Sequence, residues 1–358
     1  MWSNSDGEKI LDIFDKIKKI KLSDDAKDIL NIALLTNSYS PSNNISSDQF
    51  LKLKAEWLII NNNIQLIENY IFKNKNIPQN NDLVKFIVNS YLSKGEIENS
   101  CNIFFNIKEI ITDDYLSKFN IYCLLNNNRR DDAQLQFDLK KELGFKDIFF
   151  EKKFNFLMGY NTENDKQISE NSILDFHLSH KTNINFDFQP NEKTSKNIWK
   201  YLSNLNLLQN LDNVDLEDQS KISIIEKATH EGNYTERELY SLYKRFQFSI
   251  NQLLTVSESY KLLSNIEARA LVYQSILITN ESNRKLELIR ILRDLFLKEN
   301  IGNAFNEELI ILLKDISLED VPSNYTSFYK DSINQENEEL KRIKINNKII
   351  HQSKLLNY

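Results

Sequence analysis

The 358-residue chain has little glycine and little proline, six of the former and four of the latter. Those residues supply many of the turns that join short β-strands, so their scarcity argues against a β-sandwich or a β-barrel. Hydrophobic residues make up 41% of the chain and charged residues 27%, and 21 Phe and 15 Tyr provide large side chains for a core. The composition therefore predicts a folded protein built mainly from α-helices.

The chain also lacks an excess of positive charge and a long apolar run. Its net charge is −6 with both signs mixed along the sequence, which argues against nucleic-acid binding. No apolar run approaches the roughly 18 residues of a membrane-spanning helix, so no membrane insertion is expected. Residues 1–15 have no basic start followed by a hydrophobic stretch. We expect a cytoplasmic location for the chain as given, and a periplasmic one if its native N-terminus is missing.

Two cysteines, Cys101 and Cys123, are too few for a disulfide framework or a structural zinc site. We expect both to be ordinary buried helix residues, and the redox compartment stays open. His177 and His180 have the spacing of two zinc ligands on one helix face, but Asp175 is the only carboxylate close to them in sequence. The ligand set is incomplete. The sequence therefore predicts a packing or surface role for both histidines, with no metal and no other cofactor.

Catalytic and nucleotide-binding motifs are also missing. The chain contains no G-x-G-x-x-G, no G-x₄-G-K-[ST], no H-E-x-x-H and no G-x-S-x-G. With six glycines in all, a phosphate-binding loop is hard to build, and no pair of carboxylates stands out as a catalytic acid and base. We therefore predict that the protein is not an enzyme and has no catalytic residues.

The chain does contain an internal repeat. Over residues 46–144, residues of similar physical type recur every 33 positions, and we call this spacing the register. Polar residues suited to capping a helix start recur in the column Asp48, Asn81 and Asp114. Apolar residues then follow at helical spacing, in the columns Phe50, Leu83, Leu116; Leu53, Phe86, Phe119; Ala55, Val88, Ile121; and Leu58, Tyr91, Leu124. Residue types that tolerate the left-handed backbone of a helix end form the next column, Asn62, Gly95 and Asn128. Each unit should therefore begin with a helix that ends at this column.

A second helix is expected in each unit. Small or medium residues form one column and larger residues form the column four positions on: Ile67, Ser100, Ala133, then Ile71, Phe104, Phe137. A small side chain beside a large one lets two helices pack closely. These residues resemble the tetratricopeptide repeat, whose pattern ends its first helix in Y-x₃-G and places A-x₃-F in its second. Tyr91 with Gly95 matches the first element, and Ala133 with Phe137 matches the second.

The resemblance implies an all-α fold in which antiparallel helical hairpins stack as an α-solenoid, a tetratricopeptide-like superhelix. Four segments are predicted: a helical pair over 1–45 that caps the array, hairpin repeats over 46–160, a connector over 161–191, and a second hairpin array over 192–358. Within the connector, Asn183 to Pro190 has the alternation of a short extended segment. The second array should begin with Thr194 as a helix cap, followed by helices over 218–231, 235–247, 249–263, 266–279, 283–299 and 303–315. Residues 199–297 also resemble an uncharacterised family of helical-repeat bacterial proteins.

In a tetratricopeptide-like array, the first helix of each hairpin lines the concave surface. The register places Lys52, Lys85 and Lys118 in one column there, with Asn89 and Tyr122 one helical turn further along. Three ammonium groups in a line would bind an acidic segment or a free C-terminus, as some tetratricopeptide domains do with lysine and asparagine on this face. Charged stripes also occur on helix faces that are merely solvated.

We therefore predict a non-catalytic scaffold that binds a protein or peptide partner in this groove. The alternative is the superhelical accessory domain of a larger cell-wall enzyme, such as a soluble lytic transglycosylase.

Overall fold

The computed structural model describes residues 2–20, 22–35, 40–74, 80–107, 113–161 and 166–333. These residues are mostly helical and contain no β-strand, only an isolated bridge between Asp6 and Asn43. The predicted all-α class is confirmed. Across the same ranges, no helix is both long enough and apolar enough to cross a membrane.

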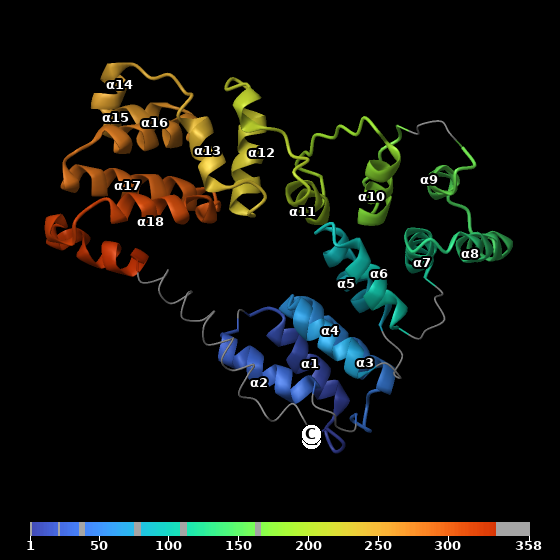
Figure 1. Ribbon diagram of the computed structural model, residues 1–358. Helices are drawn as coiled ribbons and strands as arrows, with labels where there is room; N and C mark the ends of the chain where they lie inside the picture. Colours follow the sequence, from blue (N-terminus) through green and yellow to red (C-terminus); the bar gives the residue numbers. More distant parts are fainter. Residues whose placement is uncertain are drawn as a thin grey trace. The chain divides into compact units, whose positions relative to one another are not determined.

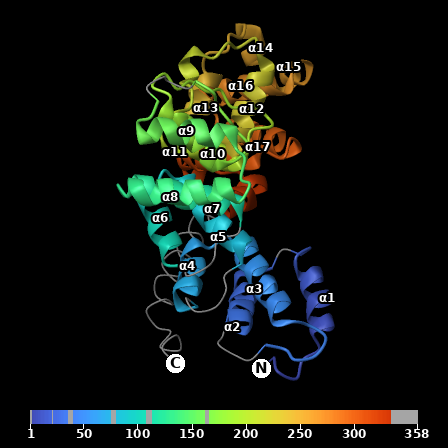
Figure 2. The ribbon, with the colours of Figure 1, turned by 90° about the vertical axis from the view of Figure 1, so that its right-hand side faces the viewer.

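The chain divides into two compact units, residues 1–207 and residues 208–358. The helices of the first unit run from blue to green in Figures 1 and 2 and are α1 Gly7–Ile17, α2 Asp24–Leu35, α3 Ser47–Asn61, α4 Ile64–Lys73, α5 Asn81–Leu92, α6 Ile97–Phe105, α7 Asp114–Asn126, α8 Arg130–Glu142, α9 Ile148–Met158, α10 Ile173–Thr182 and α11 Lys196–Asn204. The stretch 161–191, predicted as a connector, contains α10 and belongs to this unit.

Helix ends in the first unit follow the predicted register closely. All three residues of the helix-end column have the left-handed backbone, with φ of 52° at Asn62, 74° at Gly95 and 59° at Asn128. The helix starts lie slightly earlier than predicted, because the residues whose side chains accept the orphan backbone N–H groups precede the first helical residue. Those capping residues are Ser46, Asn80 and Asp113.

Both second-helix columns are buried, as the register predicts. Ile67, Ser100 and Ala133 are completely inaccessible, and Ile71, Phe104 and Phe137 are nearly so. Each second helix uses this face for packing: α6 lies against α5, and α8 lies against α7 (Figure 1). The small residue of each pair allows close approach. In α6 the Ser100 hydroxyl donates to the Val88 carbonyl oxygen of α5 at 3.3 Å.

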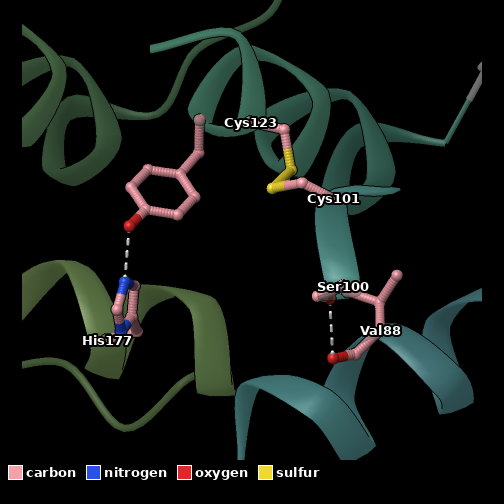
Figure 3. The surroundings of a disulfide bond; sticks show 6 residues. Val88, Ser100, Cys101, Cys123 and His177 are labelled. Carbon is pink, nitrogen blue, oxygen red and sulfur yellow. Dashed lines mark hydrogen bonds between the residues drawn. A yellow bond between two sulfur atoms is a disulfide. The ribbon is translucent and has the colours of Figure 1, made fainter. Parts of the chain in front are cut away.

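The two cysteines are buried as expected, but they are not free. Cys101 of α6 and Cys123 of α7 form a disulfide with a Cα–Cα distance of 5.5 Å, and neither residue is exposed (Figure 3). The prediction of two unpaired helix residues is therefore wrong. The number of cysteines could not predict the disulfide. The bond forms because α7 packs beside α6 and brings together two residues that are 22 positions apart in sequence.

The region predicted to be extended after α10 forms no strand. Phe186 and Phe188 instead place their rings edge-on against Phe176 of α10, with centroids 5.5 Å and 4.9 Å away. Aromatic pairs favour this geometry. The alternating apolar residues therefore serve to cover α10. The predicted cap Thr194 is replaced by its neighbour Ser195, which accepts the Ile198 N–H.

The second unit has its helices close to the predicted ranges. They are α12 Gln219–His230, α13 Glu236–Tyr243, α14 Ile250–Leu254, α15 Val256–Ser259, α16 Asn265–Ile278, α17 Ser282–Lys298 and α18 Glu307–Lys314. The helix predicted over 249–263 is broken into α14, α15 and a short 3₁₀ turn. Residues 334–358, the end of the predicted second array, lie outside the described residues.

Helix α16 forms the centre of the second unit and packs against α12, α13 and α17. Its Arg269 is buried and pairs with Glu226 of α12, with 2.6 Å between Nη2 and Oε2. The Tyr243 hydroxyl of α13 donates to the same carboxylate. An unpaired charge in this interior would be costly. The Arg269–Glu226 pair therefore has a structural explanation, the packing of α12, α13 and α16.

Candidate functional site

The predicted binding surface lies on the first helices of the three predicted hairpins, α3, α5 and α7. We call it the groove face and define it by two columns of the register: Lys52, Lys85, Lys118 and Glu56, Asn89, Tyr122. The structure shows what each of these side chains contacts.

Lys118 is buried, with 8% of its surface exposed. Its Nζ lies 2.9 Å from Oδ2 of Asp147 and 3.0 Å from Oδ1 of Asp175. Burial by itself would lower the pKa of Lys118, but the hydrogen bonds and charges of the two aspartates outweigh it, and the pKa is raised. The ammonium group is therefore charged and fully engaged within the chain.

Lys85 is half-buried and also paired, with its Nζ 2.6 Å from Oδ2 of Asp113. Asp113 caps α7, and Asp147 caps α9, so each lysine pairs with the carboxylate that starts the next helix on this face. The residue that corresponds to these aspartates at the start of α5 is Asn80, a neutral cap. Lys52 of α3 is exposed. A lysine of this column thus forms an ion pair with the start of the next helix on this face wherever that helix is capped by an aspartate.

The predicted line of three free ammonium groups is therefore absent. Only Lys52 is open to solvent, because the aspartate caps that follow α5 and α7 neutralise the other two lysines. Burial beside carboxylates is the physical reason, since a half-buried or buried ammonium requires a partner.

The second column is likewise occupied by the chain itself. Glu56 pairs with Lys18, the residue after α1, and Asn89 accepts a hydrogen bond from the Tyr115 hydroxyl of α7. The Tyr122 hydroxyl lies 2.7 Å from Nε2 of His177 on α10, a contact drawn as the dashed line at His177 in Figure 3. Asn89 and Tyr122, which were predicted to contact a partner, instead contact α7 and α10.

Helices α10 and α11 both pack on α5, one of the helices that carry the groove face, and α10 also packs on α9. Asn204, the last residue of α11, donates from its Nδ2 to the Ser93 carbonyl oxygen at 3.0 Å. Leu205 fits against Gly95, where an added Cβ would lie 2.8 Å from its Cδ2 atom. Gly95 is therefore needed both for the left-handed helix end and for this close approach.

His177 is the main hydrogen-bonding group of α10. It is 1% exposed, and its Nδ1 lies 2.9 Å from the Tyr201 hydroxyl of α11. The same hydroxyl lies 2.8 Å from Nδ1 of His180. Burial, followed by the charges of Lys181 and His180, lowers the pKa of His177 to about 3. The imidazole is therefore neutral at physiological pH and joins α7, α10 and α11.

No metal-binding constellation accompanies these histidines. Throughout the described ranges, no three His, Cys, Asp or Glu residues are grouped in a way that would hold a metal ion. Both ring nitrogens of His177 are already used by Tyr122 and Tyr201. The H-x₂-H pair is thus part of a hydrogen-bonded core.

The sequence analysis missed the partners of the groove face, although one signal was present. Asp147 lies 33 residues after Asp114, so extending the register by one more period leads to the start of α9. Asp175 and His177 had no comparable signal, because their contacts with α7 span more than 50 residues.

Comparison with protein-family models, with characterised proteins and with solved structures finds no match for the chain.

Proposed function

We propose that the protein is a non-catalytic interaction scaffold in which antiparallel, tetratricopeptide-like hairpins stack as an α-solenoid. One observation carries the proposal: the groove face already holds a helix. Helix α10 is bound there by the Lys118–Asp175 ion pair and the Tyr122–His177 hydrogen bond. Charged and aromatic contacts of this kind are how helical grooves recognise partner segments.

The partner in this proposal is a protein segment with acidic residues. It would meet the groove face where that face stays open, at the end formed by α3, where Lys52 is exposed. Elsewhere the position of a partner is taken by the chain's own Asp147 and Asp175. An acidic segment at Lys52 would repeat the lysine–carboxylate contact that the structure shows twice, at Lys85 and at Lys118.

Affinity capture followed by reconstitution tests this function. The wild-type protein, Lys52→Glu and the control Lys73→Glu are immobilised and exposed to extract of the native organism. Lys73 is an exposed lysine on α4, a helix that carries none of the groove-face residues, so the control makes the same charge change away from that face. We expect a captured protein that binds in purified form to wild type and control and at least tenfold more weakly to Lys52→Glu. The proposed open end is wrong if Lys52→Glu binds as well as the control, and the scaffold function fails if no purified protein binds.

A second candidate is favoured by the disulfide. Disulfides form and persist in oxidising compartments such as the periplasm and are rare in the cytosol. The Cys101–Cys123 bond therefore supports an extracytoplasmic location, and with it the alternative of an accessory domain in a cell-wall enzyme. Cell fractionation combined with mass spectrometry of the thiol state distinguishes the two compartments. A reduced protein in the cytosolic fraction would remove this candidate.

A further inference from the structure

Four side chains form a continuous hydrogen-bonded chain from the core of the first unit toward solvent. They are Tyr122 of α7, His177 and His180 of α10, and Tyr201 of α11, joined at 2.7, 2.9 and 2.8 Å. Tyr122 and His177 are buried, whereas His180 is partly exposed. Solvent protons therefore reach this chain at His180.

In the neutral state the four protons of this chain have one arrangement that uses every one of them. Tyr122 donates to Nε2 of His177, and Nδ1–H of His177 donates to the Tyr201 oxygen. The Tyr201 hydroxyl then donates to Nδ1 of His180, whose remaining proton is on Nε2 at the outer end. No buried donor is left without an acceptor, which is the low-energy arrangement for a buried network.

A proton added to His180 reverses the direction of the whole chain. Nδ1 of His180 then carries a proton and must donate to Tyr201, so Tyr201 has to donate to Nδ1 of His177. His177 must move its own proton to Nε2, which now points at the Tyr122 oxygen. The Tyr122 hydroxyl proton loses its acceptor inside the core, and a buried donor without a partner is costly.

The groups around His180 affect how readily its ring takes up a proton. Burial and the neighbouring Lys181 both lower the pKa of His180 below 6.5, and its ring faces Phe186 and the Tyr201 hydroxyl. Three charged groups of the adjoining elements are paired with one another: Lys118 of α7 holds both Asp147, which caps α9, and Asp175 of α10.

On α7, the Tyr115 hydroxyl donates to Asn89 of α5, and burial and the charge of Asp175 raise its pKa well above 10. Tyr115 therefore stays un-ionised in the acidic range.

We propose that His180 is an acid-operated latch, whose protonation reverses the Tyr122–His177–Tyr201–His180 chain and loosens α10 and α11 from α7. This regulation concerns the groove face of the proposed function, but the latch is a property of the isolated chain and is tested without a partner. A failed latch would leave the scaffold function intact.

Two measurements on the 358-residue chain test the latch. In ¹⁵N spectra of the imidazoles, His177 should change from the Nδ1–H to the Nε2–H tautomer over the range in which His180 titrates. In hydrogen exchange, corrected for the intrinsic rate, the protection of α10 amides should fall roughly tenfold between pH 7.5 and pH 5, beyond any change in α3.

Matched variants separate the latch from general acid destabilisation. His180→Asn keeps a polar atom near the position of Nδ1 for Tyr201 but does not titrate, so its α10 protection should follow that of α3 at both pH values. His230→Asn removes the histidine that ends α12 in the second unit and should behave as wild type. The latch is refuted if His177 keeps one tautomer while His180 titrates, or if His180→Asn loses α10 protection as wild type does.

Discussion

Replacing both cysteines with alanine measures how much the disulfide stabilises the first unit. The Cys101–Cys123 bond closes a loop with a sequence separation of 22 residues. For a loop of that length, the restriction of the unfolded chain corresponds to about 3 kcal/mol at 25 °C. Alanine is preferred to serine because both positions are fully buried, and a hydroxyl there would need a hydrogen-bonding partner.

The assay exploits the distribution of tryptophan. Trp2, Trp57 and Trp199 are the only tryptophans, and all three lie in the first unit, so fluorescence excited selectively at tryptophan reports on that unit alone. With a urea m-value of about 2–3 kcal/mol/M, the loss corresponds to a fall of roughly 1 M in the unfolding midpoint. The reasoning is refuted if the double variant and the oxidised wild type unfold at the same urea concentration. Adding a reductant to the unfolding buffer should bring the wild type to the midpoint of the variant.

Three further predictions concern the stability of the first unit and use the same fluorescence assay. Truncating Phe104 or Phe137 to Ala should each cost about 3–5 kcal/mol, because both rings are buried between helices, and unchanged midpoints would show that the predicted register is wrong. Lowering the pH from 6.5 to 5 should cost about 2 kcal/mol through His177, because the unfolded state takes up a proton that the folded state, with a pKa of about 3, does not. That contribution is fully present above pH 6.5, and His177→Asn should flatten the slope of stability against pH. Asn80→Asp should give Lys52 a carboxylate partner and add up to about 1 kcal/mol, an increment that high salt removes.

The helix ends and buried columns could be predicted because they depend on local properties. Asn62, Gly95 and Asn128 are the residue types that adopt positive φ most easily, and each ends a helix in that conformation. The alternation of small and large residues on the second helices was likewise sufficient to predict their buried face. These features require no knowledge of which distant segment packs where.

The state of the groove face could not be predicted in the same way, because its occupants are distant in sequence. Lys118 looks like a solvent-exposed lysine until Asp175, 57 residues later, is placed beside it. Tyr122 and His177 are likewise brought together only by the fold, and so are the two cysteines. Register shows which side chains share a helix face, but whether that face meets solvent depends on where the other segments of the chain pack.

A series of single lysine-to-methionine variants distinguishes a structural column from a binding column. Lys118→Met leaves Asp147 and Asp175 without their common cation in a buried site, which should cost about 3–5 kcal/mol. Lys85→Met removes a half-exposed pair and should cost no more than about 1 kcal/mol. Lys52→Met should be neutral to within about 0.5 kcal/mol, because that side chain is exposed. If the column existed only to bind a partner, all three variants would keep the wild-type urea midpoint and each would weaken capture, whereas graded losses of stability would show that the lysines first hold successive helices together.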